Sequence, residues 1–197
     1  MEHFYDTIDG WSTGIPRIYK DIVSKSKDGA HFVEIGCWLG KSSAIMCVEI
    51  INSKKNIKFD CIDIWDVGIW LDKTAEGMSS DDLYNKFMKN MEPVKDTFTV
   101  IREDSTKAAD LYADNSLDFV FLDADHSYES VKRDITAWLP KVKSGGILAG
   151  DDYHSDFPGV VAAVNETLGI LITVGPLIPA GLHRRSDRFF WYIKPRN

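Results

Sequence analysis

The sequence lacks any long hydrophobic run: no apolar stretch approaches the ~18–20 residues that a helix needs to cross a bilayer. The first residues, Met1 to Asp6, carry neither a basic flank nor a hydrophobic segment, and so do not resemble a secretory signal peptide. Basic residues are in the minority, with 23 Lys and Arg against 30 Asp and Glu and a formal net charge of −7. Because duplex nucleic acid is bound through cations that displace counterions, we expect no nucleic-acid partner, and no membrane partner either.

Cysteine is rare as well. The three cysteines, Cys37, Cys47 and Cys61, form no CxxC pair and no Cys/His spacing typical of a zinc site. An odd number of cysteines in a chain without a secretion signal favours a reducing compartment, so we expect a cytoplasmic protein. The three side chains are interpreted as small, buried hydrophobic groups.

The composition is that of a folded protein, with 44% hydrophobic and 27% charged residues, which excludes extensive intrinsic disorder. The length of 197 residues predicts a single domain over 1–197, since domains commonly have about 100–200 residues. Short apolar runs alternate with helical patterns along the chain. This alternation is typical of an α/β protein with a parallel, doubly wound sheet.

The apolar periodicity also predicts the individual elements. Strands are expected at 31–35, 57–62, 98–101, 117–122, 146–149, 170–174 and 189–193. Helices are expected within the N-terminal segment 1–29 and at 41–51, 83–91, 105–112, 128–138 and 159–168. The last two strands follow one another without a helix, which predicts an antiparallel edge. The irregular stretch 65–80 is either a lid over a ligand site or a plain surface loop.

Carboxylate side chains stand at the ends of the first five predicted strands. They are Glu34, Asp63, Asp104, Asp123 and the pair Asp151–Asp152. Ligands of a doubly wound sheet bind beyond the carboxyl ends of its strands, where these acids would converge. Converging carboxylates repel one another, which indicates a positive or hydrogen-donating partner: a cationic ligand, hydroxyl and amino groups, or a metal ion.

The first strand leads into a turn with the sequence GCWLGKSS, from Gly36 to Ser43. A P-loop requires four residues between its first glycine and Gly-Lys-Ser, whereas this turn has three. A dinucleotide-binding fingerprint requires glycine at the position of Trp38, whose indole would press against a pyrophosphate. Gly36 instead permits close backbone approach and Gly40 tight packing, with Glu34 facing the pocket. The turn therefore favours a nucleoside ligand without phosphates.

Two further strand ends each allow two roles. Asp63 can accept both ribose hydroxyls of such a ligand, or it can cap the following turn. Asp104 and Ser105 can read an adenine edge with a carboxylate and a backbone N–H, or one of them can be the N-cap of the next helix.

In combination, these motifs resemble those of the class I S-adenosylmethionine (SAM)-dependent methyltransferases. The similarity runs from EIGCWLG at 34–40 through Asp63 and Asp104 to FLDADHSYE at 121–129 and GGILAGDDY at 145–153. Within that class the chain is similar to methyltransferase family 24, a group related to the macrolide-sugar O-methyltransferases. The resemblance spans residues 32–168 and implies a Rossmann-like sheet of seven strands in the order 3-2-1-4-5-7-6, with one antiparallel edge strand.

The resemblance also implies contacts to SAM. Glu34 and the first turn would face the methionine portion, Asp63 the ribose, and Asp104 with Ser105 the adenine. The full set of expected cofactor-binding residues is Glu34, Gly36, Gly40, Ser43, Asp63, Asp104, Ser105 and Asp123. Trp11 either closes over the cofactor, as an aromatic residue often does in the family, or anchors the N-terminal segment at the surface.

Asp123, Asp151 and Asp152 end two strands that this sheet places side by side. Three carboxylates suit a hard cation such as Mg²⁺, and sugar and catechol-type O-methyltransferases hold a metal at these positions. The sequence departs from those relatives in its Asp-Asp pair, where they more often carry Glu-Asp, His-Asp or Asp-Asn. Many class I relatives also use no metal, so metal binding stays an open alternative.

His126 lies three residues after Asp123, at the start of a predicted helix. It is either a polar surface residue or a general base, because an imidazole with a pKa near ~6.5 accepts a proton at neutral pH. The macrolide-sugar enzymes carry a histidine at the matching position, which favours the catalytic role.

The leading interpretation is a SAM-dependent O-methyltransferase that acts on a small hydroxylated acceptor, preferably a sugar or glycan, with or without Mg²⁺. A NAD-type Rossmann oxidoreductase and a catalytically silent adenosyl-cofactor-binding protein are the alternatives. A basic cluster, His183 to Arg185 with Arg188, either binds an anionic group of the acceptor or forms a solvated loop. Relatives often form dimers, so a homodimer is the candidate assembly.

Overall fold

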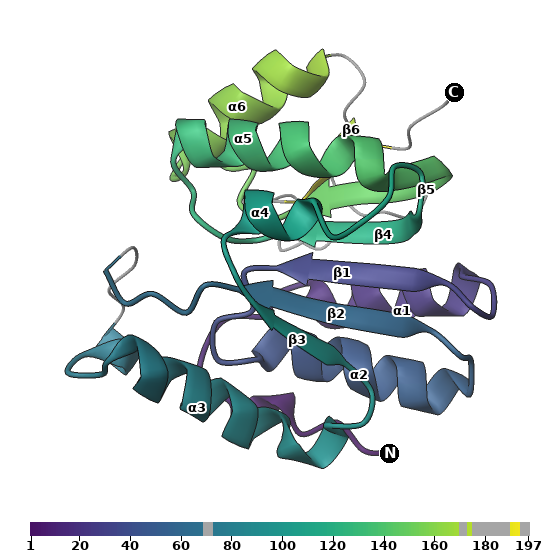
Figure 1. Ribbon diagram of the computed structural model, residues 1–197, viewed down its shortest axis with the longest axis vertical. Coiled ribbons are helices and arrows are strands. Elements are labelled where there is room, and N and C mark those ends of the chain that lie inside the picture. The colour runs from purple at the N-terminus through teal and green to yellow at the C-terminus, as the bar shows by residue number, and fades with distance from the viewer. Residues whose placement is uncertain (69–72, 170–172, 175–189, 194–197) are drawn as a thin grey trace.

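The computed structural model describes residues 1–68, 73–169, 173–174 and 190–193. At its centre is a seven-stranded sheet in the order β3-β2-β1-β4-β5-β7-β6, with helices on both faces (Figure 1). The predicted fold class and strand order are therefore confirmed. Residues 69–72 of the irregular stretch 65–80 and the basic cluster around Arg184 lie outside the described residues.

The strands are β1 His31–Ile35, β2 Lys58–Asp63, β3 Thr99–Arg102, β4 Leu117–Leu122, β5 Val142–Gly150, β6 Thr173–Val174 and β7 Trp191–Ile193. The α-helices are α1 Ile15–Lys25, α2 Lys41–Ser53, α3 Ser80–Met91, α4 Ser105–Ala109, α5 Tyr128–Trp138 and α6 Pro158–Leu168. Short 3₁₀ turns are η1 Tyr5–Thr7, η2 Lys73–Ala75, η3 Glu92–Val94 and η4 Leu139–Lys141.

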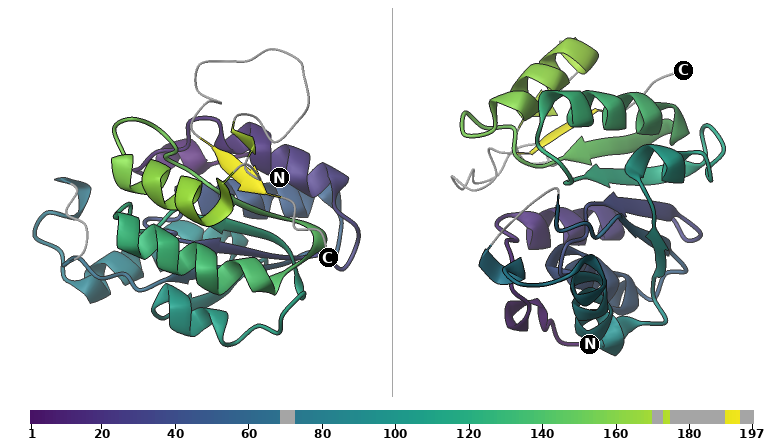
Figure 2. Two further views of the ribbon diagram at one scale, coloured as in Figure 1. Left: turned by 90° about the horizontal axis from the view of Figure 1, so that it is seen from above. Right: turned by 60° about the vertical axis from the view of Figure 1, so that its left-hand side comes forward.

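The central parallel strands are buried on both faces, which explains their continuous apolar sequences. Alternate side chains point to opposite faces: Phe32 and Phe119 pack with α1, α2 and α3, whereas Val33 and Val120 pack with α4, α5 and α6. Figure 2 shows these two helical layers on either side of the sheet. Because β1 to β5 run in parallel, the loops that follow them gather at one edge.

The antiparallel strand is β7, which pairs with both β5 and β6. The sequence predicted an antiparallel strand at the edge, but β6 occupies the edge and β7 lies one position further in. The crossover through α6 brings β6 back parallel to β5, and β7 then folds into the space between them. Gly150 is required there, because a Cβ on it would lie 2.5 Å from the Trp191 indole.

Helix α4 is shorter than predicted. It begins at Ser105 as expected, but it ends at Ala109 instead of continuing to Tyr112. Tyr112 turns inward, where its hydroxyl donates to Asp60 Oδ2 at 2.8 Å and its ring centroid lies 5.3 Å from that of Trp138. These tertiary contacts outweigh the local helical preference, which is weak in so short a segment.

The three cysteines are free and buried, as predicted, and burial raises the pKa of each thiol above its ordinary range. Among the described residues, no helix combines the length and the apolar character that crossing a bilayer requires. The single-domain organisation, the cytoplasmic location and the homodimer stay predictions.

Candidate active site

A cavity of about 630 Å³ opens at the edge where the parallel strands end. Its walls come from the turns after β1 to β5 and from the N-terminal residues 9–13. Sites for cofactors and small molecules typically have volumes of about 300–1,000 Å³, so the cavity has a suitable size. Many of the predicted site residues line it: Gly36, Asp63, Asp104, Ser105, Asp123, His126, Asp151 and Asp152.

The two glycines of the first turn pack as the sequence predicted. Gly36 has a φ of 87°, and a Cβ there would lie 2.0 Å from the carbonyl oxygen of Asp123. Gly40 has a φ of 90°, and a Cβ there would lie 2.9 Å from Met91 Sδ of α3. The turn can therefore approach β4 and α3 only because both positions lack a side chain.

Glu34 differs from its predicted role, because it is not among the described residues that line the cavity. It is 1% exposed and points to the α1–α2 side of β1, where Tyr19 Oη donates to Oε1 at 2.7 Å and the Ser43 hydroxyl donates to Oε2. Burial raises the pKa of Glu34 to about 7, although these hydroxyl donors lower it. Glu34 therefore belongs to a buried network, which we call the Glu34 network, formed with Tyr19 and Ser43.

Ser43 and Gly40 are likewise absent from the described cavity lining. Successive residues of a helix are rotated by about 100° from one another, so Ser42 reaches the cavity while Ser43 points into the core. The predicted turn thus lines the cavity through Gly36 and Ser42, and the cofactor contact predicted for Ser43 stays a prediction.

Asp63 lines the cavity, but backbone donors surround its carboxylate. The N–H groups of Cys37 and Trp38 donate to Oδ2 at 2.8 and 2.9 Å, and that of Trp65 donates to Oδ1 at 2.7 Å. Burial raises the pKa of Asp63, and these three donors lower it. Of the two predicted roles, the structure contains the turn-capping one, and ribose binding stays a prediction.

Asp104 also caps a helix while it lines the cavity. Its Oδ1 accepts from the N–H groups of Thr106 and Lys107 at 3.0 and 3.3 Å, as expected of the N-cap of α4. The Ser105 hydroxyl accepts from Trp138 Nε1 at 2.9 Å, whereas the predicted adenine contact concerned its backbone N–H. The adenine contact predicted for these two residues is untested.

Asp123, His126 and Asp152 come together at the ends of β4 and β5. His126 Nε2 lies 2.9 Å from Asp152 Oδ2 and 3.6 Å from Asp123 Oδ1, and one ligand-capable atom of each residue lies within 4.8 Å of the others. Burial would lower the pKa of His126, but the two carboxylates raise it to about 10. In this state the imidazole is protonated at neutral pH, unlike the free base expected from an ordinary histidine pKa. We call these three residues the Asp123 cluster.

Asp151, the third predicted metal ligand, is not a member of this cluster in the described structure. Its Oδ1 accepts from the Asp152 N–H at 2.8 Å, and burial together with repulsion from Asp123 and Asp152 raises its pKa to about 8. The sequence could not foresee that His126, which precedes α5, would join Asp123 and Asp152 in this cluster.

Three residues that sequence reasoning missed also shape the cavity. Trp65 lines it from the turn after β2, Lys41 from the start of α2, and Asp134 from α5. Asp134 is 5% exposed, and burial raises its pKa to about 6. A signal was available: Asp134 falls on the apolar face of α5 between Val131 and Trp138. Trp11 lines the cavity and is 67% exposed, so neither of its two interpretations is decided.

Comparison with solved structures identifies the same fold elsewhere. The O-methyltransferase NovP superposes with a TM-score of 0.65 at 18% identity, over 93% of this chain and 78% of NovP. CalS11, a TDP-rhamnose 3′-O-methyltransferase of calicheamicin biosynthesis, has a TM-score of 0.58 at 16% identity, over 92% and 77% of the two chains. A SAM-dependent O-methyltransferase of Thermotoga maritima has 0.61 at 12% identity, over 92% and 66%. At these identities the likeness concerns the fold.

Sequence comparison adds the family. The profile of methyltransferase family 24, described as a methyltransferase domain, matches residues 33–153, which is more than half of the chain. An uncharacterized protein of Sinorhizobium fredii, y4gI, is 23% identical over 150 residues, which cover 76% of this chain but only 16% of that protein. The family match includes the first turn and every strand-end acid from Asp63 to Asp152. The chain therefore belongs to methyltransferase family 24.

Proposed function

We propose that the protein transfers the methyl group of SAM to a hydroxyl oxygen of a small acceptor, preferably a sugar or glycan, with a divalent cation such as Mg²⁺ assisting. The observation that carries this proposal is the Asp123 cluster, in which two carboxylates and an imidazole face one cavity. The structural relatives NovP and CalS11 are O-methyltransferases, and CalS11 acts on a sugar nucleotide, which supports an oxygen acceptor.

The cavity fits SAM in size and in charge. Its carboxylates suit a cationic ligand, and Gly36 leaves room for a close approach to the backbone. When bound, SAM supplies a methyl group that its sulfonium has already activated. Gly36 and Ser42 would hold the methionine portion, and Asp104 with Ser105 the adenine.

The Asp123 cluster fits a divalent cation. Asp123 and Asp152 offer oxygen ligands that suit Mg²⁺, and the imidazole of His126 lies beside them. When bound, such a cation supplies Lewis acidity toward a hydroxyl group and neutralises the two carboxylates. Asp151 lies next to this pair, and its raised pKa makes it a carboxyl group that ionises when positive charge is near.

His126 is the residue that would accept the proton of the acceptor hydroxyl. The negative charge of Asp123 and Asp152 holds a proton on it, and neutralising that charge returns its pKa toward ~6.5, where Nε2 can act as a base at neutral pH. The ring of Phe157, with its centroid 4.8 Å from that of His126, shields the imidazole on one side. The chain contributes mainly alignment, because the methyl donor is already reactive.

The two alternatives each lack a supporting observation. A NAD-type oxidoreductase would have to accommodate a pyrophosphate where Trp38 lines the cavity. A silent cofactor-binding protein would share the cavity, but it would not require His126 to converge with Asp123 and Asp152.

The proposal is tested by incubating the purified protein with SAM and a panel of free sugars, sugar nucleotides and catechols, and by measuring S-adenosylhomocysteine release with Mg²⁺ or with EDTA. We expect turnover of a hydroxylated acceptor that EDTA suppresses. S-adenosylhomocysteine at 100 times its dissociation constant should add ~2.7 kcal/mol of stability in a thermal-shift assay, and NAD should add none. Stabilisation by NAD alone would overturn the proposal, and full activity in EDTA would remove the cation from it.

A further inference from the structure

We propose that Asp134 of α5 is a specificity-determining residue of the cofactor site: its Oδ1 accepts a hydrogen bond from the amino group of the adenine ring. This inference rests on the proposed function and deepens it, since it concerns how the same cavity recognises the nucleoside. It leaves the contacts proposed for Asp104 and Ser105 in place. The amino group of adenine has two N–H bonds, so Asp104 and Asp134 can each accept one of them.

Asp134 occupies a position where an apolar residue would be expected. It lies on the buried face of α5 with Val131 and Trp138, and it is 5% exposed. Burial raises its pKa to about 6, although the Ser105 hydroxyl and the positive charge of Arg133 lower it. The carboxyl group is therefore mainly ionised at neutral pH and can only accept hydrogen bonds. A buried carboxylate is costly unless donors compensate it, so each of its oxygens needs a partner.

One oxygen of Asp134 has no such partner. Oδ1 is the one buried carboxylate oxygen to which the described part of the chain supplies no hydrogen-bond donor. The indole N–H of Trp138, one helical turn further along α5, donates to the Ser105 hydroxyl instead. Buried polar atoms are nearly always paired, and an unpaired one indicates a group from outside the chain, either a water or a ligand.

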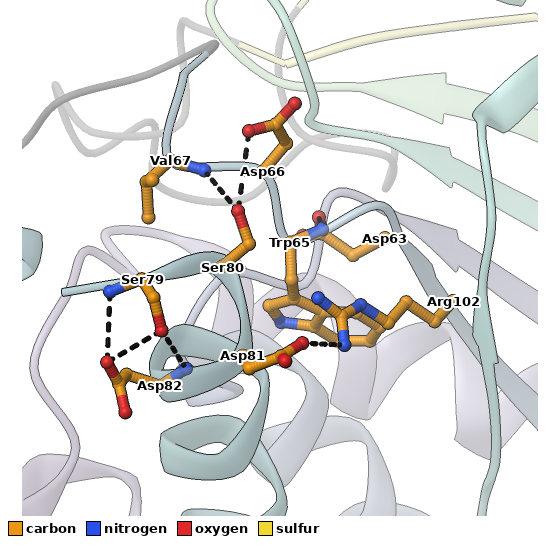
Figure 3. Close-up of polar contacts among 9 residues, drawn as sticks. All are labelled: Asp63, Trp65, Asp66, Val67, Ser79, Ser80, Asp81, Asp82 and Arg102. Atoms are coloured by element: carbon orange, nitrogen blue, oxygen red, sulfur yellow. Dashed lines mark hydrogen bonds and ion pairs between the residues drawn. The ribbon is translucent and has the colours of Figure 1, made fainter.

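The acids that follow β2 provide a comparison (Figure 3). The N–H of Trp65 donates to Asp63 Oδ1 at 2.7 Å, and the Ser80 hydroxyl donates to Asp66 Oδ1 at 3.4 Å. Asp63 and Asp66 line the same cavity as Asp134. Donors of this kind do not prevent a ligand from binding, but they stabilise the carboxylates without one. Oδ1 of Asp134 is not stabilised in this way by the described residues.

The surroundings of Asp134 favour the adenine amino group as the missing donor. Asp134 lines the large cavity together with Asp104, Ser105 and Ser130, and the first two of these are the proposed adenine contacts. A second cavity, of about 20 Å³, is lined by Asp134 and Ala124 among others. It has room for a single water, since about 10–15 Å³ is the minimum for one. A water in this small cavity is the alternative partner that the experiment must distinguish.

A carboxylate at this position would distinguish a 6-amino purine from a 6-oxo purine. Adenine presents N–H donors at C6, whereas hypoxanthine presents an oxygen there, which a carboxylate cannot pair with and repels. Sites built to bond a polar group reject analogues that lack it, because their buried polar atoms are then left unpaired. We therefore expect Asp134 to favour adenosyl over inosyl ligands.

The test measures the affinities of S-adenosylhomocysteine and S-inosylhomocysteine by calorimetry, in the unmodified protein and in Asp134→Leu. The variant replaces the carboxylate by an apolar group of similar shape. S-adenosylhomocysteine should bind about 10- to 100-fold more weakly, since a hydrogen bond to a charged group is lost. S-inosylhomocysteine should not lose affinity, because the variant removes a repulsion. The ratio of the two dissociation constants should therefore change by at least about 10-fold.

Asp134→Asn is the second variant, and it tests the inference even if Asp134→Leu does not fold. Its amide N–H can donate to the 6-oxo group, so S-inosylhomocysteine should bind about 3- to 10-fold more tightly. S-adenosylhomocysteine should bind more weakly by a similar factor, because its acceptor is no longer charged. Opposite changes for the two ligands are the expected result.

Asp60→Asn is the matched control. Asp60 is also a buried acid, it is bonded to His31 and Tyr112, and it is not part of the described cavity lining. The variant should lower stability and leave the ratio of the two affinities unchanged.

An equal loss of affinity for both ligands in the Asp134 variants would overturn the inference, because it indicates a structural carboxylate, such as one bonded to a water. Unchanged affinity for both ligands would overturn it as well. If the unmodified protein binds neither ligand, the proposed function fails and this inference fails with it. If the unmodified protein binds S-adenosylhomocysteine and every variant keeps the same ratio, this inference alone fails.

Discussion

The Glu34 network and the Asp123 cluster both begin with a carboxylate at the end of a central strand, and β1 and β4 are neighbours in the sheet. Glu34 is buried and receives neutral hydroxyl donors from Tyr19 and Ser43. Asp123 faces the cavity beside another carboxylate and a histidine. Both acids have a raised pKa, and burial is the largest cause in each case.

The difference lies in what surrounds the charge. The Glu34 network is closed, because hydroxyl donors bind the carboxylate and the core covers them. In the Asp123 cluster, the carboxylates of Asp123 and Asp152 repel each other, and both favour the protonated form of His126. The cluster also lines the cavity. A raised pKa therefore identifies a candidate catalytic group only when the group is also accessible and its partners are charged.

The largest expected effect would come from Asp123→Asn. The change removes one ligand of the proposed cation and one partner of His126 together, so we expect kcat/KM to fall by about 10,000-fold. The measurement is S-adenosylhomocysteine release over a range of Mg²⁺ concentrations, with circular dichroism as the control for folding. Activity near that of the unmodified protein would show that the Asp123 cluster, like the Glu34 network, is not required for catalysis.

His126→Gln should lower kcat by about 1,000-fold at neutral pH, within the range expected for loss of a general base. In the protein without a cation, the raised pKa of His126 means that its imidazolium stabilises the folded state below the unfolded pKa of ~6.5, and that this contribution is lost as pH rises through about 10. NMR titration of the imidazole should show it protonated at pH 8 without Mg²⁺ and neutral with Mg²⁺. An imidazole that titrates near pH 6.5 in both conditions contradicts the cluster.

Glu34→Gln should affect stability and leave catalysis nearly unchanged. Because the folded pKa of Glu34, about 7, is above the ordinary value of 4.5, the unfolded state loses its proton first as pH rises. As the pH rises from 4.5 to about 7, this group should therefore lower the free energy of unfolding by about 3 kcal/mol, and the loss should be complete above pH 7. Urea unfolding at pH 5 and pH 8 should show that loss in the unmodified protein and a smaller one in the variant. A large fall in kcat would instead indicate that Glu34 contributes to catalysis, as the sequence predicted for the cofactor site.

The smallest expected effects would come from Ser43→Ala and Ser42→Ala, which are adjacent in α2. Ser43→Ala removes a donor to Glu34 and should lower stability by about 1–3 kcal/mol without changing the affinity for S-adenosylhomocysteine. Ser42→Ala should change that affinity, because Ser42 lines the cavity. If Ser43→Ala weakens the binding of S-adenosylhomocysteine and Ser42→Ala does not, the cofactor contact originally predicted for Ser43 is supported.

The sequence anticipated the fold closely because apolar periodicity depends on local residue order. The expected helix 128–138 and strands 31–35 and 117–122 match α5, β1 and β4. The strand order followed from the family resemblance, and it is confirmed. Prediction failed where a tertiary contact decided the outcome, as when Tyr112 bonds to Asp60 and ends α4 early.

The candidate site was anticipated in its composition and less well in its geometry. The sequence identified the strand-end acids and His126, since strand ends of a doubly wound sheet face one edge. It could not foresee that Tyr19 and Ser43 would enclose Glu34, that His126 would join Asp123 and Asp152 in the cluster, or that backbone donors would surround Asp63. Those outcomes depend on which way a side chain points and on what the neighbouring loop presents to it.

The sequence by itself determined the class of the protein: alternating apolar runs require a covered parallel sheet, and the acids placed after its strands require a positive or hydrogen-donating partner. Only the tertiary structure decided which of those acids are satisfied by the protein's own donors and which face the cavity. The physical reason is that the free energy of a carboxylate depends on its distances to donors and to other charges, and these distances exist only after helices and loops distant in sequence have packed together.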